Sequence, residues 1–192
     1  FYYEENKSFI KNDNFITNSR TNDELWNSKL KKFNKFKIGL FWQGSKNYVG
    51  DIRRSIPLNK FDKIIKNKKI NVISLQKGDG TNQIKENKYE KYIIEYSKDL
   101  DNTEDAYKDT LSILKNIDLL ITSDSSVAHL AGTINKKTWL LLCYNPDWRW
   151  YIQNKSNSFY DSIKIFQQNK FGDWDNVFKS VETELELLLN NN

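Results

Sequence analysis

Short apolar runs alternate with amphipathic stretches from residue 37 to the end of the chain. The runs are nearly all apolar instead of alternating with polar residues, which predicts strands buried on both faces of a parallel sheet. The stretches between them repeat apolar residues at helical spacing, which predicts helices that cover those faces. We therefore expect an α/β fold with a Rossmann-like, doubly wound parallel sheet.

The expected elements follow one another in regular order. The predicted strands cover residues 37–42, 70–76, 92–97, 117–123, 138–143 and 163–167. The predicted helices cover residues 58–69, 103–116, 125–135 and 173–190. Thr103 and Asp173 are expected to cap two of these helices, because their side-chain oxygens can accept from a free amide of the first turn. The last helix carries an apolar stripe made of Trp174, Val177, Phe178, Val181, Leu185 and Leu188.

Residues 1–36 have a different character, being polar, rich in Asn and Lys, and poorly periodic. Leu25, Trp26, Leu30 and Phe33 are at helical spacing, so we expect an arm or linker that contains one short helix. Residues 37–190 then form a single Rossmann-like domain. The chain begins with Phe and contains no Met, so we expect it to be part of a longer protein.

Composition and charge narrow the possible functions. Hydrophobic residues make up 38% of the 192 residues and aromatic residues 14%, which excludes a disordered chain. The formal charge is +5, but the lysines are spread among asparagines and form no basic block. This pattern favours a solvated surface over a nucleic-acid interface, and a mild positive balance also suits a small anionic ligand. We expect no nucleic-acid partner.

The chain has one cysteine and one histidine, which excludes an internal disulfide and argues against a zinc-type cluster. Cys143 lies in the apolar run 138–143, so we expect a buried structural thiol and no metal or cofactor. No signal peptide is visible, and the apolar runs are far shorter than a membrane span. We expect a cytoplasmic protein with at most peripheral membrane association.

The candidate chemistry lies directly after the predicted strands. In doubly wound sheets, ligands bind outside the carboxyl ends of the strands, where the helices begin. Polar or glycine-bearing segments follow these strands at residues 42–45, 76–80, 123–126 and 144–150. We expect these four segments to meet at one edge of the sheet.

The segment 123–126 is the strongest candidate for an anion site. Asp124 ends a strand, and Ser125 and Ser126 begin the next helix. The first amides of a helix have no partner within it and lie at the positive end of its dipole. His129, four residues after Ser125, shares that helix face and can also donate. The alternative is that Asp124 or Ser125 only caps the helix and that His129 is a core residue. Gly132 is expected to permit close packing of this helix on the sheet.

The other segments are more ambiguous. The loop after the first strand offers Lys46, Arg53 and Arg54 as phosphate contacts, or as solvated charges. It is not a Walker A loop, and no G-x-G-x-x-G follows the strand. Between residues 148 and 160, several aromatic side chains surround Arg149. They can stack on a nucleobase or cover a sugar, or they can close the core as a loop.

The run "DLLITSDSSVAHLAGTINKKTWLLLCYNPDWRW", followed by "SFYDSIKIFQQ" and "GDW", resembles the C-terminal half of glycosyltransferases of the heptosyltransferase-like family 9. The blocks "GLFWQGS", "RRSIPL" and "ISLQKG" and the pair Asp109–Thr110 come in the order expected for that family. The resemblance covers about residues 36–190 and is closest to the branch often fused to tetratricopeptide repeats. It implies the GT-B architecture, in which two Rossmann-like domains flank a cleft and the C-terminal one binds a nucleotide-sugar.

The resemblance also implies roles for particular residues. The donor-pocket motif matches Asp124, Ser125, Ser126 and His129. The loop near the phosphates matches Gln43, Gly44 and Ser45, and the loop beside the nucleoside matches Gln76 and Lys77. Members of this branch often have a histidine before the "RSIPL" block, whereas this chain has "KNYVGDIRRSIPL" without one.

The implied reaction is inverting, metal-independent transfer of a sugar from a nucleotide-sugar to a glycan, protein or other acceptor. The catalytic base is expected in an N-terminal GT-B domain that these residues do not contain. The alternative is a catalytically inactive nucleotide-sugar-binding or interaction module.

Overall fold

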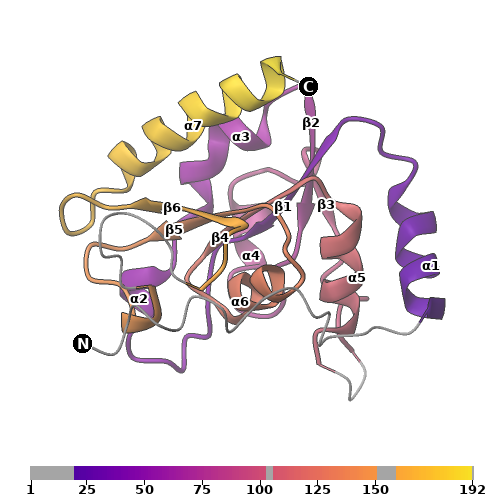
Figure 1. Ribbon diagram of the computed structural model, residues 1–192, viewed down its shortest axis with the longest axis horizontal. Helices are drawn as coiled ribbons and strands as arrows, with labels where there is room; N and C mark the ends of the chain where they lie inside the picture. Colours follow the sequence, from indigo (N-terminus) through magenta and orange to yellow (C-terminus); the bar gives the residue numbers. More distant parts are fainter. Residues whose placement is uncertain (1–19, 103–105, 151–158, 192) are drawn as a thin grey trace.

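A computed structural model describes residues 20–102, 106–150 and 159–191, and it confirms the predicted α/β fold (Figure 1). The six strands form one sheet in the order β3-β2-β1-β4-β5-β6, and every neighbouring pair is parallel. Reversal of the winding direction at β1 and β4 makes this a doubly wound sheet. The strands are β1 Phe36–Phe41, β2 Ile70–Ser74, β3 Ile93–Glu95, β4 Leu119–Ser123, β5 Thr138–Leu142 and β6 Ile163–Gln167.

The strands are buried to the degree that their composition predicts. Every residue of β4 and β5 is buried, because helices cover both faces of the sheet at its centre. The shortest strand, β3, lies at one edge, and only one of its three residues is buried.

Helices divide into two layers (Figure 1). One face of the sheet packs against η1 Leu58–Phe61, α3 Asp62–Ile65, α4 Asn82–Glu86 and α7 Trp174–Asn190. The other face packs against α1 Arg20–Leu30, α5 Lys108–Asn116 and α6 Ser126–Thr133. The carboxyl ends of the strands therefore lie between these layers, where the connecting loops cross the edge of the sheet.

The last helix agrees closely with its sequence pattern. Asp173 accepts a hydrogen bond from the amide of Asn176 at 3.2 Å, which is the expected cap. The apolar stripe packs into the core from Trp174 to Leu185, and Leu188 packs against it partly buried.

The helix in the N-terminal segment packs as part of the domain. Trp26 and Leu30 are each 1% exposed and belong to the same apolar cluster as α5. The Trp26 indole also donates to Asp109 at 2.7 Å. This helix therefore belongs to the helical layer that covers one face of the sheet, although its sequence suggested an arm. Residues 1–19 of the predicted arm lie outside the described residues.

Three expectations about helices need correction. The expected helix 58–69 is shorter and is divided into η1 and α3. The expected helix 103–116 begins only at Lys108, after Tyr107 in a left-handed conformation with φ +66°, and the predicted cap Thr103 lies outside the described residues. Two short helices, α2 Asp51–Arg54 and α4, occupy loops in which no helix was expected.

Cys143 directly follows β5 and is 8% exposed, which confirms the expected buried thiol. Burial raises the pKa of this thiol above its usual range. In the part of the chain that the structure describes, no helix is both long enough and apolar enough to cross a bilayer.

Candidate functional site

The four polar segments that follow the strands meet around a pocket of about 650 Å³ at the carboxyl edge of the sheet. The pocket lies where the loops after β1, β2, β4 and β5 converge, as expected for a doubly wound sheet. Its lining contains Phe41, Gln43, Gly44, Ser45, Arg54, Lys77, Gly78, Asp79, Tyr107, Asp124, Ser125, Ser126, His129 and Arg149. Most of the candidate residues therefore share one cavity.

The first turn of α6 forms one wall of the pocket. Ser125 is the residue before the helix and has an extended backbone, with φ −155°. Its hydroxyl lies 3.1 Å from that of Thr122, and within the described residues its side chain makes no capping hydrogen bond. The hydroxyl of Ser126 lies 2.6 Å from the phenol of Tyr107. Among the described residues, the amides of Ser126 and Val127 have neither an intrahelical partner nor the cap that the simpler interpretation required, whereas the amide of Ala128 donates to the Ser125 carbonyl at 3.1 Å.

His129 lies one turn further along α6, where it is partly buried and lines the pocket. Its ring stacks on Trp150, with centroids 4.4 Å apart and an interplanar angle of 17°. Nδ1 lies 3.3 Å from the hydroxyl of Tyr160, and Nε2 is buried with no hydrogen-bond partner among the described residues. Burial, and secondarily the positive charge of Arg149, lower the pKa of the imidazole. The ring therefore favours the neutral form and packs against Trp150 beside the pocket.

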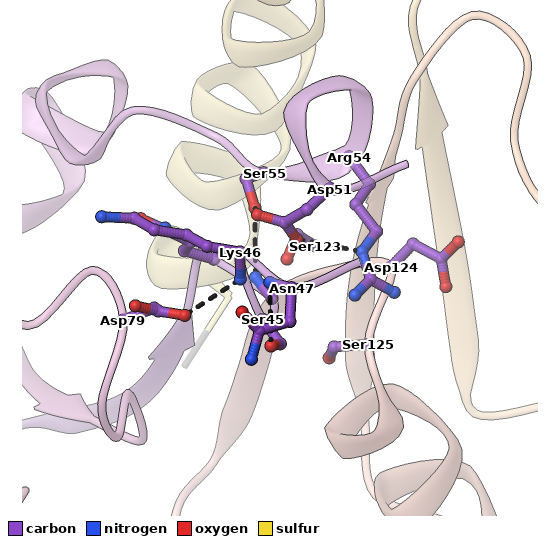
Figure 2. Close-up of polar contacts among 12 residues, drawn as sticks. Ser45, Lys46, Asn47, Asp51, Arg54, Ser55, Asp79, Ser123, Asp124 and Ser125 are labelled. Carbon is purple, nitrogen blue, oxygen red and sulfur yellow. Dashed lines mark hydrogen bonds and ion pairs between the residues drawn. The ribbon is translucent and has the colours of Figure 1, made fainter. Parts of the chain in front are cut away.

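Asp124 is 7% exposed, and one of its carboxylate oxygens accepts a hydrogen bond from the indole of Trp150 at 2.7 Å. The other carboxylate oxygen of Asp124 accepts no hydrogen bond from the described residues. Figure 2 shows Asp124 and Ser125 beside the guanidinium of Arg54 at this end of the sheet.

Gln76 lies beneath the pocket instead of lining it, and its side chain is 1% exposed. Its Oε1 accepts from the amides of Trp42 and Gln43 at 3.1 and 3.0 Å. Its Nε2 donates to the carbonyls of Gln43 and Asp79, each at 2.7 Å. Gln76 therefore fixes the loop after β1 to the loop after β2, and so shapes the pocket from behind.

The candidate cations occupy different places. Arg54 and Lys77 line the pocket, and the Lys77 ammonium donates to the carbonyl of Asp101 and to Asn102 Oδ1. Lys46 lines a neighbouring hollow of about 500 Å³ beside the loop after β1. Arg53 is exposed on α2 and is not part of the pocket lining.

Some pocket residues were not candidates for anion binding in the sequence. Arg149 was noted only within an aromatic cluster; it lines the pocket, and its guanidinium is held by Asp147 at 2.8 and 3.2 Å. Tyr107 and Asp79 lie in turns whose direction depends on a left-handed backbone, at Tyr107 itself and at Gly78 and Gly80. Arg149 and Asp79 carried a readable signal, namely their places in the polar segments 144–150 and 76–80 that follow apolar strands.

Gly132 has a role different from the one expected. A Cβ at this position would lie 2.5 Å from the ring of Tyr160, so the glycine makes room for the ring that contacts His129. Across the described residues, no group of three or more His, Cys, Asp or Glu side chains is arranged to hold a metal ion.

Comparison with known proteins identifies the fold. No family model and no curated protein matches the chain. Among solved structures, the ADP-heptose lipopolysaccharide heptosyltransferase II of E. coli matches with a TM-score of 0.60 and 10% identity, over 90% of this chain and 53% of that one. E. coli heptosyltransferase WaaC, solved with ADP-2-deoxy-2-fluoro heptose, matches with a TM-score of 0.53 and 7% identity, over 84% and 47%.

The chain thus spans about half the length of the heptosyltransferases that it matches. Its six-stranded parallel sheet corresponds to one domain of the GT-B architecture. At these identities the likeness establishes the fold and leaves the chemistry to be argued from the pocket.

Proposed function

We propose that this chain is the donor-binding half of a glycosyltransferase, which holds a nucleotide-sugar while the sugar is transferred with inversion and without a metal ion. The observation that carries the proposal is the pocket beside the first turn of α6, where amides, hydroxyls and basic side chains converge on one cavity. The chain also shares the fold of half of a heptosyltransferase.

The chemistry follows from the charge that develops as the sugar departs. The leaving nucleoside diphosphate gains negative charge, and fixed donors that are already oriented stabilise it without reorganisation. The amides of Ser126 and Val127, the hydroxyl of Ser126 and the guanidinium of Arg54 are such donors. Asp124 orients the sugar through the carboxylate oxygen that Trp150 leaves available.

The base that deprotonates the acceptor would come from an N-terminal GT-B domain, with which this chain would form the cleft. Both carboxylates of the pocket already accept hydrogen bonds, Asp124 from Trp150 and Asp79 from the amide of Lys46 at 2.9 Å. The same observation favours the second candidate function, a nucleotide-sugar-binding module without catalysis. The acceptor in the first case is a glycan or a protein.

Titration with ADP, GDP and UDP, followed by the amide resonances of Ser125 and Ser126, tests the binding step. We expect at least one of these nucleotides to shift both resonances, and its parent nucleoside to bind more weakly. Ser126→Asp places a carboxylate at the anion site and should weaken binding about tenfold or more. Ser180→Asp, on the exposed face of α7, is the matched control. Unmoved amides at millimolar nucleotide would refute the proposal.

Catalysis is tested in a longer chain that contains both halves. Loss of sugar transfer in Asp124→Asn, with nucleotide affinity retained, supports a transferase. A two-domain protein that binds nucleotide-sugars and transfers nothing, even to a broad set of acceptors, would favour the binding module.

A further inference from the structure

Asp51 is a buried carboxylate next to the pocket that no role described so far explains. It is 5% exposed and begins the short helix α2 in the loop after β1. Burying a carboxylate is unfavourable unless it is paired and hydrogen-bonded. Its partners therefore indicate what it does.

Two side-chain donors next to the pocket form hydrogen bonds with Asp51. Asp51 accepts from Arg54 Nε at 3.1 Å and from the hydroxyl of Ser55 at 2.8 Å. The Ser55 oxygen in turn accepts from the amide of Gly44 at 3.1 Å. Figure 2 shows this network, with Asp51 between Arg54 and Ser55. One carboxylate thus fixes a guanidinium and, through a hydroxyl, the backbone of the neighbouring loop.

The geometry leaves the outer edge of Arg54 for a ligand. Nε is taken by Asp51, and the Tyr48 ring lies 4.6 Å from Cζ on one face of the guanidinium. Neither terminal nitrogen has a hydrogen-bond partner among the described residues. Figure 2 shows these nitrogens directed toward Ser125 at the beginning of α6. A guanidinium held in this way presents its two terminal nitrogens as a fork that suits a phosphoryl group.

The fit around Gly44 shows how closely the network is packed against the loop. A Cβ at Gly44 would lie 2.4 Å from Asp51 Oδ1 and 2.5 Å from Arg54 Nη2. With a larger residue at position 44, the ends of the Asp51 and Arg54 side chains would have to shift. The pocket face of this loop is thus built against the Asp51–Arg54 pair.

We propose that Asp51 is a positioning residue for the anion-binding pocket, acting through Arg54 and through the Ser55–Gly44 contact without touching the ligand. The proposal rests on the proposed function, since it assumes that phosphoryl groups bind between Arg54 and α6. Holding Arg54 in place beforehand removes the cost of ordering a long side chain when the ligand arrives.

Asp51→Asn tests the proposal, because the amide still accepts from Ser55 but no longer attracts Arg54. We expect affinity for ADP and for inorganic pyrophosphate to fall about five- to twentyfold, and affinity for adenosine to stay within about twofold. Asp62→Asn is the matched control. Asp62 also begins a short helix and pairs with a basic side chain, since its Oδ1 lies 2.7 Å from Lys66 Nζ. Neither residue of this pair lines the pocket.

A double-mutant cycle separates positioning from a general structural effect. If Asp51 acts through Arg54, then Asp51→Asn should change pyrophosphate affinity by less than about twofold in an Arg54→Gln background. The proposal would be overturned if Asp51→Asn lowered pyrophosphate affinity by about the same five- to twentyfold in the Arg54→Gln background. An unchanged affinity in Asp51→Asn alone would also overturn it.

A second measurement needs no variant and holds even if Asp51→Asn does not fold. In the wild-type chain, the Arg54 Nε–H resonance should be protected from exchange without ligand and should shift on adding pyrophosphate. Rapid exchange of this proton overturns the positioning role. Pyrophosphate binding without nucleotide binding would refute the proposed function and leave the role of Asp51 standing, whereas binding of neither would refute both.

Discussion

The imidazole of His129 and the indole of Trp150 stack nearly parallel, and the same indole donates to Asp124. Trp150 is 1% exposed, so it forms the floor on which two candidate ligand-binding side chains are placed. The aromatic cluster around Arg149 was interpreted from the sequence either as a surface for a base or sugar or as a loop that closes the core. For Trp150, burial favours the second interpretation.

Trp150→Phe should keep much of the stacking but remove the donor to Asp124. Asp124 would then be a buried carboxylate without the hydrogen bond from the indole, which costs about 2–4 kcal/mol of unfolding free energy together with the lost ring volume. Urea unfolding measures this loss. Trp148→Phe, in the same turn but 74% exposed, should change the free energy by less than about 0.5 kcal/mol. Equal effects of the two substitutions would contradict this role of Trp150.

The sheet could be predicted from the sequence because burial on both faces imposes a nearly continuous apolar run on each strand. Strands such as β4 and β5 are readable without any knowledge of their neighbours. The predicted site segments followed from the same reasoning, since they are the polar residues after those runs. The convergence of Gly44, Ser125 and His129 on one pocket is a consequence of parallel topology.

What the sequence did not reveal depends on contacts between distant segments. Helix α2 has only four residues, too few to show a period, and its link to the loop after β1 is a hydrogen bond from the Gly44 amide to Ser55, eleven residues later. Gly132 was expected to pack on the sheet, but the neighbour that requires it is Tyr160, 28 residues later in the numbering. Pairings of this kind have no period in the chain, and so propensity and spacing cannot reveal them.

Gln76→Leu should destabilise the protein strongly, although Gln76 does not line the pocket. The substitution would leave two amides and two carbonyls of the loops after β1 and β2 without their partner. Each unsatisfied buried group is costly, so we expect a loss of about 3 kcal/mol or more. Gln167→Leu removes one exposed contact to the carbonyl of Tyr144 and is the matched control. A loss below about 1 kcal/mol in Gln76→Leu would show that the loops hold each other by other means.

His129 should make the stability of the protein depend on pH below about 6.5, the ordinary pKa of a histidine side chain. Burial lowers the pKa of its imidazole below the ordinary value of 6.5, so the folded state prefers the neutral ring. The unfolded chain then binds the proton more readily. The stabilisation that the neutral His129 ring gives the folded state is therefore complete above about pH 6.5. It is lost as the pH falls through the lowered pKa that the imidazole has in the folded state. Unfolding free energies from urea titrations at a series of pH values measure this loss.

The chain contains a single histidine, which makes this prediction unusually direct. His129→Gln removes the titrating group and should flatten the decline in stability between pH 7 and pH 5. Carboxylates whose pKa is lowered, such as Asp147 beside Arg149, titrate below that window and should act equally in both proteins. In the wild-type chain, a proton resonance of the imidazole should titrate below pH 6.5. Parallel stability curves for the two proteins, or an imidazole that titrates above pH 6.5, would show that the pocket does not hold His129 neutral.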